Sequence, residues 1–298
     1  METEMKTIDV VFDMETSDPD DFLALCLLCG HPRVNLQAVT ITPGSSYQVG
    51  LVRWLLNQFE LDIPVGARNI MHPKKCVSDW HYRAYGDIPP ATEYDDAAEV
   101  LYGVCDENTV LVTGAALTNV QDAIRLGSGL DRPFTLGLWN PQGGFAGEGV
   151  VPPEDQLDKF KGLSTCPTFN FNGNPKAAFA CLEHPGIKER RLVSKNVCHG
   201  VVYNQFTHTF LKKTTEPGLG LQLIMQGMEA YLERKPKGKK FHDPLAVCAA
   251  IDPTVITWAE VEMYRERGKW GARLKPGSGT WISVKVDTLK MVEILSEC

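Results

Sequence analysis

The feature that most constrains this chain is a dense group of acidic residues after an early apolar segment. Val10 to Phe12 predicts a buried strand, and Phe22 to Leu28 is apolar over a length typical of a helix. Because open α/β sheets bind ligands beyond the carboxyl ends of their strands, a ligand site is predicted between the two segments. Five acids lie there within nine residues: Asp13, Glu15, Asp18, Asp20 and Asp21.

These acids are predicted to surround a cation, because like charges placed so closely repel one another. The donors are hard oxygens without a nearby histidine or cysteine, which favours Ca²⁺ or Mg²⁺ over zinc. The competing interpretation is helix capping by Asp18 and Pro19, with the next two acids complementing the helix dipole. Capping leaves Asp13 and Glu15 unexplained, so we expect a cation or ribose site.

Strands and helices alternate through most of the sequence. Strands are expected at 10–12, 35–42, 63–65, 109–113, 134–139, 191–197, 255–265 and 280–286. Helices are expected at 22–28, 47–61, 95–105, 116–126, 175–183 and 219–233. The short connections predict a single α/β domain over residues 1–298, with a mostly parallel central sheet and helices on both faces. Two long stretches, 67–92 and 140–171, are predicted to be functional loops.

Composition and charge exclude several classes of partner. The chain is 43% hydrophobic and 22% charged, as in soluble globular proteins, and its net charge of −7 argues against nucleic acid or an anionic membrane. Of its nine cysteines, Cys26 and Cys29 have C-x-x-C spacing, but they lie inside the apolar segment without a second pair and are interpreted as buried thiols. Residues 1–4 carry no apolar signal core, and no segment is apolar enough to span a membrane. We therefore expect a cytoplasmic enzyme that binds a small molecule.

A second acidic position lies in His242-Asp243-Pro244-Leu245-Ala246, before an apolar segment. Alone, a His-Asp pair at a helix start is more often a cap than an active site. Together with three further motifs, it resembles the nucleoside hydrolase (inosine–uridine-preferring) family over nearly the whole chain. The further motifs are Asp13-Met14-Glu15 with Asp20-Asp21 for the family's Asp-x-Asp…Asp-Asp, Leu117-Thr118-Asn119 for its Leu-Thr-Asn, and Asn170-Phe171-Asn172 for its Glu-Phe-Asn.

The resemblance implies a nucleoside-hydrolase-like, Rossmann-related fold and Ca²⁺-dependent cleavage of the N-glycosidic bond of a riboside. The implied metal ligands are Glu15, Asp21, Asp243 and the carbonyl of Thr118, and Glu15 also activates the attacking water. Because the transition state is an oxocarbenium-like ribosyl cation, a pocket lined by carboxylates suits this chemistry. Family members often form dimers or tetramers, so the resemblance allows a homo-oligomer.

The same resemblance assigns residues to the substrate. Asp20 and Asn172 are implied to bind the ribose, and His242 to protonate or orient the leaving base. Aromatic side chains in the two long loops suit base recognition, and we expect His81 and Trp139 to line the site.

The chain departs from the family pattern at three positions. Glu15 stands where the family has Asp, with one extra residue before Asp20, so Asp13 is the alternative metal ligand. Ser45 stands where the family has an Asn that contacts ribose. Asn170 replaces the Glu that accepts the ribose 5′-hydroxyl.

Asn170 leads to a hypothesis about the substrate. A carboxylate beside the 5′ position repels phosphate, whereas an amide does not and can donate hydrogen bonds. We therefore expect 5′-substituted ribosides, such as nucleotides or ADP-ribose, as ligands. The variant opening motif also resembles the branch of nucleoside-hydrolase-like bacterial type III effectors, which points the same way. The candidate counter-charges are Lys74, Lys75, Arg83, Lys237, Lys239 and Lys240.

Two other functions compete with a Ca²⁺-dependent N-ribosyl hydrolase. One is a catalytically weak or inactive ribosyl-ligand binding protein on the same fold, since a fold does not establish activity. The other is a haloacid-dehalogenase-type phosphohydrolase, because Phe12-Asp13-Met14-Glu15-Thr16 resembles that group's Asp-x-Asp-x-Thr, with Asp13 as the nucleophile.

Overall fold

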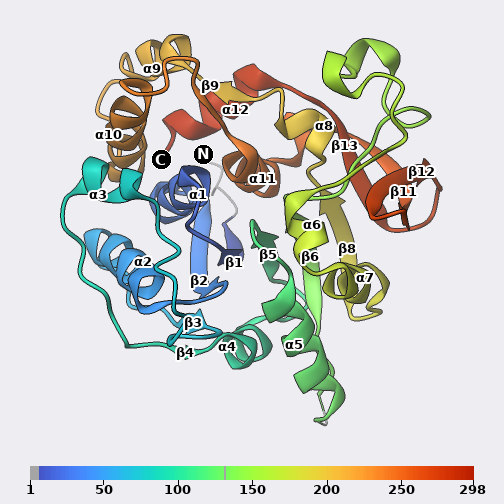
Figure 1. The fold of residues 1–298 in the computed structure, drawn as a ribbon, viewed down its shortest axis with the longest axis horizontal. Coiled ribbons are helices and arrows are strands. Elements are labelled where there is room, and N and C mark those ends of the chain that lie inside the picture. Colours follow the sequence, from blue (N-terminus) through green and yellow to red (C-terminus); the bar gives the residue numbers. More distant parts are fainter. Residues whose placement is uncertain (1–6, 131) are drawn as a thin grey trace, which may run out of the picture.

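A computed structural model describes residues 7–130 and 132–298, and in it the chain forms a central sheet covered by helices (Figure 1). The expectation for residues 1–4 falls outside the described residues. The sheet has 11 strands in the order β4-β3-β2-β1-β5-β6-β8-β13-β11-β12-β7. These strands are β1 (Ile8–Met14), β2 (Val34–Ile41), β3 (Val65–Ala67), β4 (Asp95–Asp96), β5 (Val110–Thr113), β6 (Leu136–Pro141), β7 (Thr165–Cys166), β8 (Ile187–Leu192), β11 (Ile256–Glu266), β12 (Lys269–Leu274) and β13 (Thr280–Val286).

The sheet is mostly parallel. Neighbouring strands from β4 to β13 in this order all pair in parallel. The antiparallel strands β11, β12 and β7 extend one edge. A separate two-stranded sheet joins β9 (Val202–Tyr203) to β10 (Lys239–Lys240). The predicted fold class, an α/β domain with a mostly parallel sheet and helices on both faces, is confirmed.

Helices cover both faces of the sheet (Figure 1). On β1, Val10, Phe12 and Met14 belong to the core under α1, α10 and α11, whereas Val11 belongs to the core under α4, α5 and α7. Alternate side chains of one central strand are thus buried on opposite faces, as in doubly covered parallel sheets. The helices are α1 (Pro19–Gly30), α2 (Ser46–Gln58), α3 (Asp79–Tyr85), α4 (Ala97–Val104), α5 (Thr118–Ser128), α6 (Phe169–Gly173), α7 (Pro175–Glu183), α8 (Lys195–Cys198), α9 (Gln205–Leu211), α10 (Leu219–Leu232), α11 (His242–Ile251) and α12 (Thr288–Ser296).

Helix α1 is enclosed by protein on all sides. Every residue from Pro19 to Leu28 is buried, because α1 packs against α10 and α11 as well as the sheet. This explains why its sequence is apolar throughout instead of showing one apolar stripe. It also means that the acids of its first turn are held in a rigid position.

Several elements differ from the prediction. The stretch 67–92 was expected to be a loop, but it contains helix α3. The aromatic side chains of this helix pack against Phe22. Strand β8 ends at Leu192, so the later part of the predicted strand 191–197 is helix α8. The pattern also missed α9, α12 and strand β12, which are short. Within the described residues, no helix is both long and apolar enough to cross a membrane.

His81 on α3 lies inside this aromatic cluster. Its side chain is fully buried, with ring centroids 5.3 Å from Phe22 and 4.8 Å from Trp80. Burial lowers the pKa of His81 to about 4, against an ordinary value of 6.5. The imidazole is therefore neutral in the folded protein at pH 7.

We predict that replacing His81 with Gln weakens the fall in the free energy of unfolding as the pH is lowered from 7 to 5. Because the folded-state pKa lies below the unfolded value, the unfolded chain binds a proton first as the pH falls below 6.5. The wild type should lose about 2 kcal/mol of unfolding free energy from this group between pH 7 and pH 5, and H81Q should not. Urea unfolding at both pH values measures the difference, and parallel profiles would contradict the assignment.

Candidate functional site

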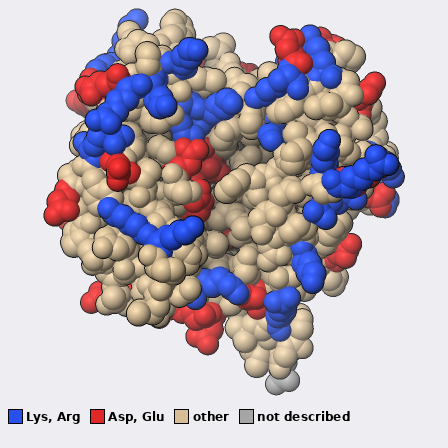
Figure 2. Space-filling model, viewed as in Figure 1, with Lys and Arg blue, Asp and Glu red and all other residues tan. Residues whose placement is uncertain are grey.

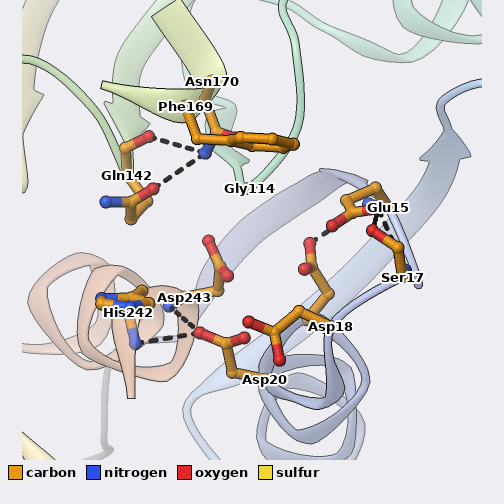
Figure 3. Close-up of a pocket in the computed structure, with 11 residues that line it drawn as sticks. Glu15, Ser17, Asp18, Asp20, Gly114, Gln142, Phe169, Asn170, His242 and Asp243 are labelled. Carbon is orange, nitrogen blue, oxygen red and sulfur yellow. Dashed lines mark hydrogen bonds between the residues drawn. The ribbon is translucent and has the colours of Figure 1, made fainter. Parts of the chain in front are cut away.

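The acidic motif lies where the central parallel strands end. The Gly114 amide donates to the Asp13 carbonyl at 2.8 Å, and the Gln142 amide donates to the Thr113 carbonyl at 2.8 Å, so the ends of β1, β5 and β6 meet at one edge. The first turns of α1 and α11 point to the same place (Figure 3). This is the crevice at the carboxyl edge in which open α/β folds place their ligands.

A cavity of about 390 Å³ opens at this edge. Figure 2 shows acidic residues at the centre of a hollow whose borders carry many basic residues. Six of the predicted site residues line the cavity, from the strand–helix turn after β1, α6 and α11. The complete lining is Glu15, Ser17, Asp18, Asp20, Asp21, Gly114, Gln142, Phe169, Asn170, His242 and Asp243.

Asp20 joins α1 to α11. Its carboxylate accepts hydrogen bonds from the backbone amides of His242, at 3.0 Å, and Asp243, at 3.4 Å, at the start of α11. It also pairs with the ammonium of Lys239 at 2.9 Å, and both side chains are almost fully buried. Burial alone would raise the pKa of Asp20, but the charge of Lys239 and the hydrogen bond from its ammonium hold that pKa below its ordinary value. Asp20 is therefore an ionised carboxylate.

Asp21 and Asp243 face each other, and in the described part of the chain neither forms an ion pair with a lysine as Asp20 does. Burial, and then the negative charges around them, raise the pKa of both carboxyls well above the ordinary value. One carboxylate oxygen from each of Asp20, Asp21 and Asp243 lies within 4.8 Å of the other two. Among the described residues, Asp243 Oδ1 has no hydrogen-bond partner. A buried, unpartnered oxygen beside two other carboxylates is the environment in which a cation lowers the free energy.

Gly114 leaves room for this group of oxygens. A Cβ at Gly114 would lie 2.6 Å from Asp21 Oδ1 and 2.7 Å from Asp243 Oδ1, closer than atoms can approach. Both carboxylates thus point at the same stretch of bare backbone at the end of β5. The donor set, which consists of carboxylate oxygens, fits a hard cation such as Ca²⁺ or Mg²⁺.

Glu15 lines the cavity, and one oxygen of its carboxylate is engaged by Ser17. It accepts hydrogen bonds from the backbone amide of Ser17, at 2.9 Å, and from the Ser17 hydroxyl. The Glu15 backbone amide donates to Asp21 Oδ1 at 3.1 Å. The residue therefore orients Asp21 through its main chain, while Ser17 engages Oε2, one of the two oxygens of its carboxylate.

Asp13 is placed behind the cavity, so the prediction that it contacts the metal is not matched by its position. Its side chain is fully buried and accepts hydrogen bonds from Thr40 Oγ1 at 2.7 Å and Asn119 Nδ2 at 2.8 Å. Burial raises its pKa to about 7. An enclosed carboxyl without access to the cavity also makes a poor nucleophile, which disfavours the phosphohydrolase interpretation.

His242 lines the cavity as a neutral imidazole. Burial lowers its pKa to about 4, and Nδ1 lies 3.2 Å from Cys198 Sγ. Its ring centroid is 4.7 Å from that of His199. The contact with Cys198 fixes the orientation of the ring.

Asn170 is held against Gln142. Its side-chain amide donates to the Gln142 carbonyl at 3.0 Å and to the Gln142 side-chain oxygen at 2.8 Å. Gln142 in turn donates to Cys198 Sγ at 3.3 Å, so this wall of the cavity continues towards α8. Phe169 lies beside them and is 81% exposed, which leaves its ring free to cover a ligand (Figure 3).

Two residues expected to recognise the base do not line the cavity. Trp139 is fully buried, stacks on Phe171 at 5.9 Å and donates to Thr113 Oγ1 at 3.1 Å. His81 is enclosed between Phe22 and Trp80, as described above. Both are core side chains, because their segments form a central strand and a packed helix instead of open loops.

Three further predicted contacts also lie outside the cavity wall. Ser45 caps α2 by accepting from the Gln48 amide and donates to the Lys75 carbonyl at 2.6 Å. Thr118 begins α5, where its hydroxyl accepts from Asn174. Asn172 donates to the Gly268 carbonyl at 2.7 Å. None of the three lines the cavity, and the metal contact implied for Thr118 stays a prediction because it runs through the backbone carbonyl and not the hydroxyl.

The sequence patterns missed several residues of the site. Lys239 was expected as a candidate counter-charge for a ligand phosphate, but it is only 4% exposed and pairs with Asp18 at 3.1 Å as well as with Asp20. Asp18 consequently makes no side-chain capping bond to α1. Gln142 falls in the long stretch 140–171, whose length alone indicated function, whereas Phe169 was among the aromatic side chains of that stretch expected to suit base recognition. For Gly114, the only indication in the sequence was its position directly after the predicted strand 109–113.

Comparisons with known proteins agree with this architecture. The model of the family described as inosine-uridine preferring nucleoside hydrolase matches residues 10–293. An uncharacterized protein of Aquifex aeolicus (strain VF5) is 28% identical over 289 residues, covering 93% of this chain and 94% of that protein. Two solved structures have the same fold: a plant nucleoside hydrolase, PpNRh1 (18% identity, TM-score 0.70, 97% and 98% coverage), and an inosine-guanosine nucleoside hydrolase (20% identity, TM-score 0.69, 97% and 98% coverage).

Replacing Asp243 with Asn tests whether its carboxylate is repelled by those of Asp20 and Asp21. Without divalent cations at neutral pH, we expect Tm to rise by about 3 °C, because ionising a carboxyl whose pKa is raised costs folding free energy. Added Ca²⁺ should raise the Tm of the wild type but not of D243N. Thermal unfolding in chelator and in Ca²⁺ measures both effects.

The control for this variant is Asp62→Asn, since Asp62 is exposed and is not among the residues that line the cavity. It should leave both melting temperatures unchanged. A lower Tm of D243N in chelator, together with an undiminished response to Ca²⁺, would contradict a cation site at Asp243.

Proposed function

The chain belongs to the inosine-uridine preferring nucleoside hydrolase family, whose members are N-glycosidases, and from this premise we propose that it is a Ca²⁺-dependent N-ribosyl hydrolase. Its substrate is a ribonucleoside or a 5′-substituted riboside. The observation that carries the proposal is the convergence of Asp20, Asp21 and Asp243, whose oxygens lie within 4.8 Å of one another in a cavity large enough for a sugar.

Asp21 and Asp243 would hold Ca²⁺, with Glu15 within the same cavity as a further ligand. When bound, the ion supplies Lewis acidity that lowers the pKa of a water and binds ribose hydroxyls. Asp20 cannot serve the ion equally, because its carboxylate already accepts from Lys239 and from two backbone amides. Its free capacity suits a ribose hydroxyl.

The reaction adds water across the bond between C1′ of the ribose and the base nitrogen. The hydroxyl joins C1′, the base leaves with the bonding electrons, and it takes up a proton. Positive charge develops on the ribosyl group as this bond breaks, and the fixed carboxylates stabilise that charge without reorganising. His242 faces the cavity and, held by Cys198, can orient the departing base through its other ring nitrogen.

A second candidate is a ribosyl-ligand binding protein with weak or absent turnover. The observation that favours it is the hydrogen bonding of Glu15 Oε2 to Ser17, since these bonds engage one of the two oxygens that a water-activating carboxylate would offer. Both candidates use the same cavity and differ in whether sugar is released.

The compartment follows from cysteine chemistry. The nine cysteines are all free, and most of them are buried. Free thiols persist where the environment is reducing. We therefore assign the protein to the cytoplasm and expect a small-molecule ligand, in keeping with its acidic cavity.

Ribose release tests the proposal. Inosine, uridine, adenosine, their 5′-monophosphates and ADP-ribose are incubated with the protein in Ca²⁺ or in chelator. We expect release of ribose or ribose phosphate in Ca²⁺ only, with Asp21→Asn lowering kcat/KM by roughly 100-fold or more. Asp62→Asn serves as the matched acid-to-amide control.

Three outcomes are distinguishable. Release from no member of the panel, together with ligand binding by calorimetry, would establish the binding protein instead. Phosphate release that requires Asp13 would establish the phosphohydrolase. Sugar release that is equal in chelator and in Ca²⁺ would remove the metal from the proposal.

A further inference from the structure

Three lysines from separate segments meet beside the cavity. Lys159 lies on the 3-10 helix η2 (Asp158–Phe160), Lys195 begins α8, and Lys240 ends β10. Lys159 Nζ lies 2.6 Å from His199 Nδ1, and Lys240 Nζ lies 3.5 Å from the same nitrogen. The charge of Lys195 also acts on both His199 and Lys159. Residues up to 81 positions apart in the sequence thus build one basic cluster.

The cluster carries no counter-charge of its own. Among the described residues, none of its three lysines has a carboxylate within salt-bridge distance, whereas Lys239 next to Lys240 is paired with two. Burial, and then the charge of Lys240, lower the pKa of Lys159 below its ordinary value. His199 adds no positive charge, because burial and the neighbouring cations lower its pKa to about 3. Like charges held together in this way are the signature of a site for an anion.

The cluster adjoins the catalytic cavity. The ring of His199 packs at an interplanar angle of 43° against that of His242, which lines the cavity, with the centroids 4.7 Å apart. On the other side, Lys195 Nζ donates to the Pro167 carbonyl at 2.8 Å, two residues before Phe169 in the cavity wall. An extended ligand can therefore reach from the acidic cavity to the lysines. Figure 2 shows this change from acidic centre to basic rim across the hollow.

An anion suits the cluster better than a metal ion does. Cys198, His199 and His242 could offer three soft ligand atoms within 4.8 Å of one another. However, the ammonium of Lys159 lies against His199 Nδ1, and two further ammonium groups surround it, so a divalent cation would be repelled. Phosphate oxygens accept hydrogen bonds from several ammonium groups at once.

We propose that Lys159, Lys195 and Lys240 form a phosphate subsite, which makes 5′-phosphorylated ribosides the preferred substrates. This inference rests on the proposed function, since it assumes that ribose occupies the acidic cavity. There the 2′- and 3′-hydroxyls face the carboxylates and C1′ carries the base, so C5′ is the free attachment point. The carboxylates repel a phosphate from the cavity, and the lysines attract it to the rim. Hydrolysis then yields the free base and ribose 5-phosphate.

The subsite is tested by two calorimetric titrations of the protein in Ca²⁺, one with ribose 5-phosphate and one with ribose. Neither ligand carries a base, so no turnover occurs. The wild type should bind ribose 5-phosphate roughly tenfold or more tightly, and added salt should reduce the preference. Lys159→Ala combined with Lys240→Ala should bring the two affinities within about twofold, while the affinity for ribose stays unchanged. The control is Lys161→Ala, an exposed neighbour on the same segment that pairs with Asp158 at 2.7 Å.

Equal affinities for the two sugars in the wild type would overturn the proposal, as would a preference that survives in the double variant or disappears in K161A. These results leave the hydrolase proposal standing, because ribose release from nucleosides is measured separately. Conversely, a lysine-dependent preference without any cleavage of the N-glycosidic bond would refute the hydrolase and retain the subsite.

Discussion

The buried carboxylate of Asp20 is the point on which the rest of the site depends. It ties the first turn of α1 to the first turn of α11 through two backbone amides and through Lys239. Since the next residue of α1 is Asp21 and the second residue of α11 is Asp243, this link brings two uncompensated acids together. Removing Lys239 would leave the buried Asp20 carboxylate without its partner, a change that typically costs about 3–5 kcal/mol.

The charged side chains around this link differ in whether they are paired, according to where they lie. Lys239 neutralises Asp18 and Asp20 inside the protein, whereas Asp21 and Asp243 remain available in the cavity, and Lys159, Lys195 and Lys240 remain available at the rim. The cavity therefore favours positive charge, on a cation and on a developing ribosyl group. The rim favours negative charge. One riboside with a phosphate at its far end satisfies both regions at once.

The fold and part of the site follow from the sequence because both rest on local patterns. Apolar strands followed by acids predicted the parallel sheet and the crevice containing Asp20 and Asp21. Position along the chain could not show that Asp13, one residue before the end of β1, is enclosed by Thr40 and Asn119. Nor could it show that Lys239, in a run of basic residues, turns inward to Asp20 across more than 200 positions. Such pairings arise only in the assembled fold.

The central claim is that Asp21 and Asp243 share a cation with which the protein binds a riboside. Calorimetric titration of the metal-free protein with Ca²⁺ tests it most directly. The account predicts one Ca²⁺ per chain in the wild type and none at this site in Asp21→Asn, with Asp62→Asn binding as the wild type does. Absence of Ca²⁺ binding, or binding that Asp21→Asn leaves intact, would contradict it.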